Sequence, residues 1–195
     1  ILTDNGQGLS HEFIARLASD VIALREKGRE IIIVSSGAVA AGLARLGLDT
    51  RPSALDELQA AAAVGQSSLV QAYEAAFAPS GYLCAQILLS HDDVKSRDRY
   101  LNARATLQTL LDKGVIPIVN ENDTVVTDEI RFGDNDTLAA LVANLIDADA
   151  LLMLTDQQGL FNADPRTVSD ATLIQETDAH NTSLDAMVSD GSTLG

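Results

Sequence analysis

The feature that most constrains the fold of this chain is a regular alternation between short apolar runs and segments of helical periodicity. The runs read EIIIVSSG from position 30, LCAQILL from 83, VIPIV from 115 and ALLMLT from 150. Strands of a parallel sheet are buried on both faces and therefore read as continuous apolar runs, and a helix connects each strand to the next. The alternation predicts an α/β fold with parallel β–α units. Because no linker or internal repeat interrupts it, we expect one domain over residues 1–195.

Helical segments separate these runs, and the sequence marks several of their ends. Ser10 is a suitable N-cap for a helix that Gly28 ends, with apolar side chains at helical spacing between them. A long alanine-rich helix is expected from roughly Glu57 to Ala78, with Gly65 inside it as a point of close packing. Further helices are expected in SSGAVAAGLARLG, in RYLNARATLQTLLDKG and after GDND.

Composition excludes several classes of partner. A net charge of -15 and a pI near 4.3 disfavour a phosphate backbone as ligand, and few aromatic residues (4%, no Trp) are available to stack on single-stranded nucleic acid. No apolar run approaches the ~20 residues that span a bilayer, and no basic segment with a following apolar leader is recognisable. The one cysteine, Cys84, lies in an apolar run, where a buried, inert thiol is expected. These features predict a cytoplasmic protein with no membrane partner and no nucleic-acid partner through this segment.

Polar residues follow the apolar runs, at the edge of a parallel sheet where the carboxyl ends of the strands meet and ligands bind. They are SSG at 35–37, SHDD at 90–93, NEND at 120–123 and TDQQG at 155–159. Side chains of these types also form ordinary turns, and for any one segment that is the better interpretation. Their collection at one edge predicts a ligand site.

The segment VSSGAVAAG places Ser35, Ser36 and Gly37 at a strand-to-helix junction. Free N–H groups and the helix dipole make such a junction an anion site, and glycine allows close approach. A capped helix without a ligand is the alternative, and it is preferred when the segment is taken alone. Neither the lysine-containing P-loop pattern nor a complete G-x-G-x-x-G fingerprint is present, so standard nucleotide motifs do not explain this segment.

The segment NENDTV places hydrogen-bond donors and carboxylates directly after a strand, from Asn120 to Asp123. Such a cluster suits a zwitterion, with Asp123 paired to an ammonium group. A calcium loop is a competing interpretation, but neither this segment nor GDNDTL has the EF-hand spacing. No His or Cys cluster indicates zinc, and we predict no metal site built from protein side chains. The three histidines fall in a helix start, a loop and a tail, where surface or capping roles are the expectation: His11, His91 and His180.

Asp134 and Asp136 flank Asn135 where an apolar helix begins, in a chain that is already strongly acidic. An acidic helix cap is the simplest explanation. The alternative is that these side chains face a cation, which would be a ligand ammonium, a lysine or a metal ion.

Six motifs occur in this order along nearly the whole chain: SSGAVAAG, AAVGQS, RDRYLNARATL, IPIVNENDTV, IRFGDNDTLAALVA and LTDQQGLFNADPR. Together they resemble the amino-acid kinase family, and within it the members that phosphorylate glutamate. The resemblance implies a three-layer αβα sandwich with a mostly parallel central sheet. It also implies transfer of the γ-phosphate of ATP, with Mg2+, to the γ-carboxylate of L-glutamate, the first step of proline biosynthesis. The same resemblance implies a homo-oligomer that proline inhibits.

By the same resemblance, residues at matching motif positions would contact the family's two ligands, glutamate and the nucleotide. The residues that would contact glutamate are Ser36, Asp123 and Asn135, with Asn120 and the backbone at Gly37 as weaker candidates. Those that would contact the nucleotide are Thr155 and Asp156, with GLFNADPR forming part of the adenosine pocket. By the same resemblance, Asp136 would orient the catalytic lysines.

Phosphoryl transfer to a carboxylate makes a particular demand on charge. The acceptor is already ionised near neutral pH, so no general base is required, but positive charge must bring one anion up to another. The three lysines of the chain match no catalytic position of the family: Lys27, Lys95 and Lys113. The resemblance implies that one catalytic lysine would precede Ile1 and the other would follow Gly195. We therefore expect a segment truncated at both ends that is inactive alone.

Other interpretations remain open at this point. Within the family, the acceptor would instead be aspartate, N-acetylglutamate or UMP. From another class, the chain would be a non-catalytic sensor of glutamate or proline, whereas a dinucleotide-binding oxidoreductase lacks its fingerprint. The arginines of RDRYLNAR are expected on a solvated helix face, with a subunit contact as the alternative: Arg97, Arg99 and Arg104.

Overall fold

The computed structural model describes residues 2, 8–90, 93, 95–125, 135–155, 157–182 and 184. The chain divides into two compact units, residues 1–152 and residues 153–195. Each unit is considered by itself. None of the described helices is both long enough and apolar enough to cross a membrane.

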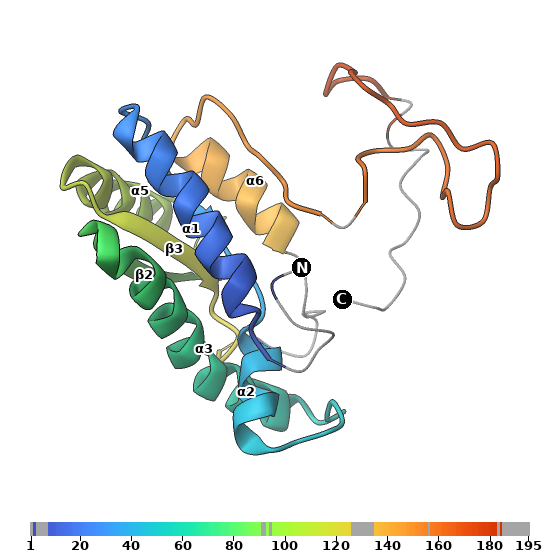
Figure 1. The fold of residues 1–195 in the computed structure, drawn as a ribbon. Coiled ribbons are helices and arrows are strands. Elements are labelled where there is room, and N and C mark those ends of the chain that lie inside the picture. Colours follow the sequence, from blue (N-terminus) through green and yellow to red (C-terminus); the bar gives the residue numbers. More distant parts are fainter. Residues whose placement is uncertain are drawn as a thin grey trace. The chain divides into compact units, whose positions relative to one another are not determined.

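A parallel sheet forms the centre of the first unit (Figure 1). Its strands are β1 (Ile33–Val34), β2 (Cys84–Leu89) and β3 (Ile116–Glu121), in the order β1-β3-β2. Val34 lies opposite Val119 on one side of β3, and Leu89 lies opposite Glu121 on the other. The predicted parallel α/β arrangement is confirmed for these three runs.

Helices connect the strands, as the periodicity predicted. Ser10 caps the first helix, where its side chain accepts a hydrogen bond from the Phe13 N–H at 3.3 Å. The helices of the first unit are α1 (His11–Glu26), α2 (Ala38–Leu46), α3 (Leu55–Phe77), α5 (Arg97–Asp112) and α6 (Asn135–Leu145), with a short 3-10 turn, η1 (Ala78–Ser80), after α3.

Successive side chains of β3 point to opposite faces of the sheet, and each face has its own core. Ile116 and Ile118 belong to a cluster with residues of α1 and α3, whereas Val119 belongs to a cluster with residues of α5 and α6. Helices therefore cover both faces of the sheet (Figure 1). The three-layer αβα sandwich is confirmed, and the chain is long enough to build both cores.

Two glycines let α2 and α3 approach closely. A Cβ on Gly65 would lie 1.8 Å from the carbonyl oxygen of Ala38, and one on Gly42 would lie 1.7 Å from the carbonyl oxygen of Ala61. Neither position accepts a larger side chain without movement of a backbone. Gly65 is thus the point of close packing that the sequence predicted, and its partner is the first residue of α2.

The strand predicted at 150–155 is wrong. Leu151 to Leu154 form no strand, and Leu152 is 82% exposed. A strand exists through hydrogen bonds to a neighbouring backbone, and no strand in the described part of the chain pairs with this segment. An apolar run indicates what a segment would bury but not which backbone it would pair with.

The described part of the second unit consists of turns and extended segments. An antiparallel bridge joins Phe161 to Leu173, and the Asn162 side chain accepts a hydrogen bond from the Thr172 N–H at 2.8 Å. Asp164 binds the backbone and side chain of Arg166, and both contacts hold the pKa of Asp164 below its usual range. The GLFNADPR segment is therefore organised by local hydrogen bonds.

Candidate substrate site

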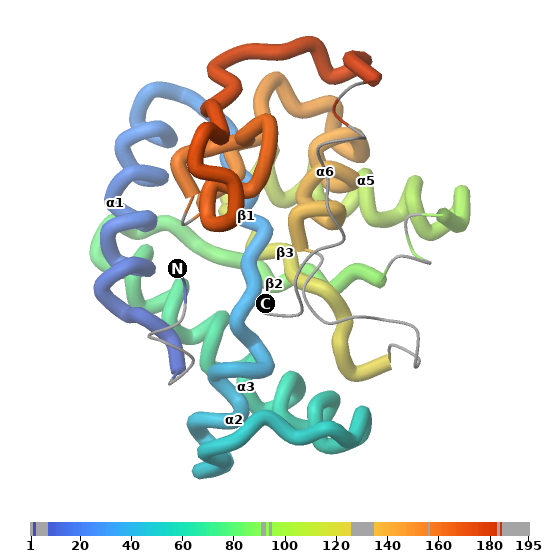
Figure 2. The backbone as a smooth tube through the Cα atoms, turned by 90° about the vertical axis from the view of Figure 1, so that its right-hand side faces the viewer, coloured from blue at the N-terminus to red at the C-terminus, as the bar shows by residue number. Residues whose placement is uncertain are grey.

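The carboxyl ends of β1 and β3 bring two of the predicted site segments to one edge of the sheet. Beyond the pair Val34–Val119, the Ser35 N–H donates to the Val119 carbonyl at 2.9 Å, which extends the ladder by one residue. Ser36 and Gly37 then leave β1 at the edge where Asn120 and Asp123 leave β3. Figure 2 shows β1 running directly into α2 at this edge.

Gly37 is the N-cap of α2 and has a left-handed backbone conformation, with φ of 92°. This conformation favours glycine, and no side chain caps the helix. The first N–H groups of α2 are therefore available to an anion, together with the positive end of the helix dipole. Ser36, next to Gly37, is exposed, whereas Ser35 is buried and points into the protein. Of the two predicted serines, only Ser36 is accessible to a ligand.

Asn120 is buried at the end of β3 and is fully engaged with protein groups. Its Nδ2 donates to Gln66 Oε1 at 2.8 Å, and its Oδ1 accepts from the Glu121 N–H at 2.8 Å. Its side chain is therefore held in one orientation. A direct contact between Asn120 and the substrate stays a prediction.

Two carboxylates follow at the same edge. Glu121 is buried, and Asp123 is half-buried. Burial, and secondly the negative charge of Glu121, raise the pKa of Asp123 to about 6. A cation bound beside Glu121 and Asp123 would lower the pKa of Asp123, because a nearby ammonium group favours the ionised form of a carboxyl group.

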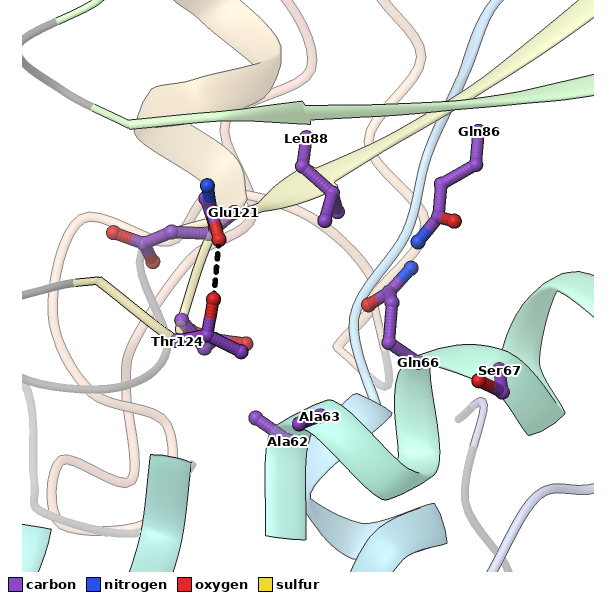
Figure 3. Close-up of a pocket in the computed structure, with 10 residues that line it drawn as sticks. Ala62, Ala63, Gln66, Ser67, Gln86, Leu88, Glu121 and Thr124 are labelled. Atoms are coloured by element: carbon purple, nitrogen blue, oxygen red, sulfur yellow. Dashed lines mark hydrogen bonds between the residues drawn. The ribbon is translucent and has the colours of Figure 1, made fainter. Parts of the chain in front are cut away.

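A pocket of about 250 Å³ opens beside these acids, between α3 and the ends of β2 and β3 (Figure 3). Gln66 of α3 is 8% exposed, and its Nε2 has no hydrogen-bond partner among the described residues. In Figure 3 the amides of Gln66 and Gln86 point toward one another. The residues that line the pocket are Ala62, Ala63, Gln66, Ser67, Gln86, Leu88, Glu121, Asn122, Asp123 and Thr124.

Sequence reasoning assigned no role to Gln66 or Gln86. Gln66 belongs to the AAVGQS motif, and the available signal was a single amide next to Gly65 on an otherwise apolar helix face. Gln86 lies in an apolar strand, and its position beside Gln66 depends on the packing of α3 against the sheet. No local pattern would have paired these two residues.

The first turn of α6 carries Asn135 and Asp136. Asn135 Oδ1 is buried and has no hydrogen-bond partner in the described part of the chain, so it can accept a hydrogen bond from a ligand. Asp136 is exposed at the positive end of the helix dipole, which agrees with both the capping and the cation-facing interpretations. Asp134 lies outside the described residues.

The predicted nucleotide contacts belong to the second unit. Thr155 is exposed, and its hydroxyl accepts a hydrogen bond from the Gln157 N–H at 3.2 Å. Asp156 lies outside the described residues. Nothing in the described part of the chain groups three His, Cys, Asp or Glu side chains as a metal site would require.

In the SHDD segment after β2, Ser90 and Asp93 bind one another, and Asp93 is helical. The backbone N–H and the hydroxyl of Ser90 both donate to Asp93 Oδ2, at 2.8 and 2.6 Å, and Arg99 contacts Oδ1 at 2.9 Å. The Ser90 hydrogen bonds, more than Arg99, hold the pKa of Asp93 below its usual range. Asp93 is thus engaged by its own neighbours, Ser90 and Arg99.

Two of the three lysines lie at the opposite edge of the sheet. Lys27 is the C-cap of α1 and Lys113 is the C-cap of α5, each just before the start of a strand. Helices between parallel strands run back from the carboxyl edge to the amino edge, so these side chains are remote from Gly37 and Asp123. Lys95 is exposed and helical, between β2 and α5.

Comparison with known proteins gives a consistent result. A sequence model described as the Amino acid kinase family matches residues 1–193. The chain is 60% identical over 196 residues to "Glutamate 5-kinase" of Paraburkholderia phymatum. The matched region covers 100% of this chain and 53% of that relative. It is 61% identical over 195 residues to "Glutamate 5-kinase" of Saccharophagus degradans, covering 100% of this chain and 52% of the relative. The chain thus spans about half the length of the curated relatives that it matches.

Proposed function

The chain belongs to the amino acid kinase family, and on that premise we propose that the protein containing it transfers the γ-phosphate of ATP to the γ-carboxylate of L-glutamate. The product would be L-glutamyl 5-phosphate, the first intermediate on the route to proline. The names of the relatives support this choice of acceptor over aspartate, N-acetylglutamate or UMP.

The observation that carries the proposal is the mixed character of the pocket beside α3. Asp123 and Glu121 offer negative charge to an ammonium group, and the buried Nε2 of Gln66 offers a donor to a carboxylate or carbonyl oxygen. An α-amino acid presents both groups on one carbon. The volume of about 250 Å³ is large enough for an amino acid.

The chemistry needs positioning more than acid–base catalysis. A γ-carboxylate oxygen forms a bond to the γ-phosphorus while the bond from that phosphorus to the β–γ bridging oxygen breaks, and no proton moves. We assign the N–H groups at Gly37 and the Ser36 hydroxyl to anionic oxygens of the reactants, and Asp123 and Asn135 to the substrate ammonium. The buried, unpartnered Oδ1 of Asn135 supports this role.

ATP and Mg2+ complete the proposal. Mg2+ bound with a nucleotide takes most of its ligands from phosphate and water, so a dedicated cluster of protein ligands is not required. We assign Thr155 and Asp156 to the nucleotide and Asp136 to the orientation of catalytic cations. Because Lys27 and Lys113 lie at the other edge of the sheet, those cations would come from outside the described residues. We further propose one kinase domain that includes both compact units.

The remaining expectations belong to the same proposal: a cytoplasmic homo-oligomer, inhibited by proline. Proline carries an ammonium group and a carboxylate on one carbon, as glutamate does, so the pocket beside α3 is chemically suited to either. Arg97, Arg99 and Arg104 give no further support to a subunit contact, since Arg99 pairs with Asp93 and Arg104 pairs with Asp147.

The test is acyl-phosphate formation by the complete protein, trapped as a hydroxamate, with ATP and L-glutamate, L-aspartate or N-acetylglutamate. We expect a signal with glutamate alone, and suppression by proline. Asp123→Asn should weaken glutamate binding, whereas Asp20→Asn, at an exposed position of α1, should leave it unchanged. Glutamate or proline binding without hydroxamate would support the sensor instead, and a signal with another acid would reassign the acceptor.

A further inference from the structure

The buried polar residues of the described chain are few and lie together. They are Ser35, Gln66, Asn120 and Glu121. Two hydrogen bonds join this group to α3: Tyr73 Oη lies 3.1 Å from Ser35 Oγ, and Asn120 Nδ2 donates to Gln66 Oε1 at 2.8 Å. Ser35 follows β1 and Asn120 belongs to β3, so α3 binds the carboxyl ends of two neighbouring strands.

The two side chains on α3 share one face of that helix. Gln66 and Tyr73 are seven residues apart, which is about two turns and returns a side chain to nearly the same direction. Both are buried, and Tyr73 is 0% exposed. One rigid element therefore sets the positions of the residues that precede Ser36 and Asp123.

Ser35 is held from two sides. Its N–H donates to the Val119 carbonyl at 2.9 Å, and its hydroxyl meets Tyr73 at 3.1 Å and approaches the Ser36 carbonyl at 3.4 Å. A serine hydroxyl has one proton, so when it is directed at the Ser36 carbonyl, Tyr73 must be the donor to Ser35. Burial raises the pKa of Tyr73, which keeps its hydroxyl protonated and able to donate.

The orientation of the Ser36 carbonyl determines that of the next N–H group. The peptide unit between Ser36 and Gly37 is planar, so its carbonyl and the Gly37 N–H point in opposite directions as one rigid group. Gly37 begins α2, and the close contact of Gly65 with the Ala38 carbonyl ties the next residue to α3 as well.

We propose that Tyr73 is a positioning residue, which acts through Ser35 to orient the Gly37 N–H. In the same way, Gln66 holds the side chain of Asn120 in place at the end of the neighbouring strand, β3. Helix α3 is then a brace that sets the spacing of the two loops before a ligand arrives. The consequence for glutamate binding rests on the proposed function; the effect on the Gly37 amide does not.

Tyr73→Phe in the complete protein tests the brace, because it removes one hydroxyl and keeps the buried ring. The matched control is Tyr82→Phe, at a half-buried tyrosine whose ring contacts Arg25. Loss of one hydrogen bond that aligns a donor should raise the KM for glutamate about three- to tenfold, with kcat and the KM for ATP within about twofold of wild type. Amide hydrogen exchange of a peptide covering residues 36–40, measured without ligand, should be faster in Tyr73→Phe only.

The two measurements separate failure of the brace from failure of the proposed function. Faster exchange together with a raised KM for glutamate supports the inference. Wild-type kinetics in Tyr73→Phe overturn the positioning role, whatever the exchange. If the wild-type protein phosphorylates no glutamate, the proposed function fails and exchange alone decides: equal exchange in Tyr73→Phe and Tyr82→Phe overturns the brace.

Discussion

On one face of the sheet, α1 and α3 pack through alanines and through large side chains such as Ile14, Leu69 and Phe77, and α3 adds two hydrogen-bonded polar pairs. On the other face α5 and α6 pack through leucine and valine side chains. The first face contains the close backbone approaches at Gly42 and Gly65, together with the buried polar side chains that bond to α3. The second is held by residues such as Leu107, which is 0% exposed. The layer of α1 and α3 thus also lines the candidate pocket, whereas the layer of α5 and α6 provides apolar packing and, at the start of α6, Asn135 and Asp136.

Comparison of the two layers shows that burial alone does not identify a functional element. Both layers bury apolar side chains in a core cluster against the sheet. Only the α3 layer combines backbone proximity with polar contacts to the carboxyl ends of β1 and β3. The variants that follow are all made in the complete protein.

The largest expected effect is on the α5 and α6 side. Leu107→Ala removes a fully buried side chain, and we expect a loss of about 2–5 kcal/mol in the free energy of unfolding, measured by urea titration. The KM for glutamate of the protein that remains folded should not change, because Leu107 belongs to the apolar core between the sheet, α5 and α6 and not to the residues assigned to the ligand. Leu101→Ala, at a residue 50% exposed on the same helix, is the control and should cost about 0.5 kcal/mol or less. A raised KM in Leu107→Ala alone would break the distinction.

Gly65→Ala tests the close approach on the α3 side. Its Cβ would lie 1.8 Å from the Ala38 carbonyl, so we expect destabilisation of about 1–3 kcal/mol, although alanine is the better helix former. Because Ala38 follows Gly37, the KM for glutamate should also rise. Ala75→Gly, at an exposed position of α3, should cost about 1 kcal/mol through helix propensity and leave the KM unchanged. A stabilised Gly65→Ala protein would contradict the packing described above.

Asp123→Asn separates stability from binding within the α3 layer. The folded-state pKa of about 6 exceeds the ordinary value of 3.8, so the folded state holds this proton more tightly. The stability that Asp123 contributes is therefore full below pH 3.8 and is lost as the pH rises through about 6. Allowing for partial exposure, we expect the unliganded variant to be more stable than wild type by about 1–2 kcal/mol above pH 6.

Unfolding of the wild type and of Asp123→Asn at pH 4.5 and pH 7.5 checks this sign. The difference should fall to about a third of its size at the lower pH, which still lies above the ordinary pKa of 3.8, while glutamate binding at pH 7.5 should be weaker in the variant. A variant that is less stable at pH 7.5 would mean that Asp123 already has a cationic partner in the unliganded protein.

The smallest effect is expected at the surface of the α5 and α6 layer. Arg104 pairs with Asp147 in solvent, and exposed ion pairs of this kind contribute about 0–1 kcal/mol. Arg104→Ala should therefore shift the unfolding midpoint only slightly, and added salt should reduce even that shift. A loss comparable to that of Leu107→Ala would show that ion pairs, and not apolar packing, hold this layer.

The sequence was sufficient for the elements whose signals are local. The helices of the first unit and three of the four strands follow from periodicity and apolar runs, and Ser10 and Gly65 have the roles that their residue types indicated. The run at 150–155 failed because a strand needs a partner, and pairing is a non-local property. For the site, the segments after β1 and β3 were identified correctly as neighbours, since parallel strands must end at one edge.

By itself, the sequence determined the class of fold, the edge of the sheet where polar residues gather, and the family to which the motifs belong. Only the tertiary structure decided that Ser35 turns inward to Tyr73 while Ser36 stays accessible, that Gln66 both holds Asn120 and lines the pocket, and that Lys27 and Lys113 lie at the far edge. The physical reason is that residue type and spacing report local backbone preference and burial. Which side chains meet depends on how α3 packs on the sheet. The contacts that fix this packing join residues that are distant in the chain: Ser35 and Tyr73 are separated by 38 positions, and Gln66 and Asn120 by 54.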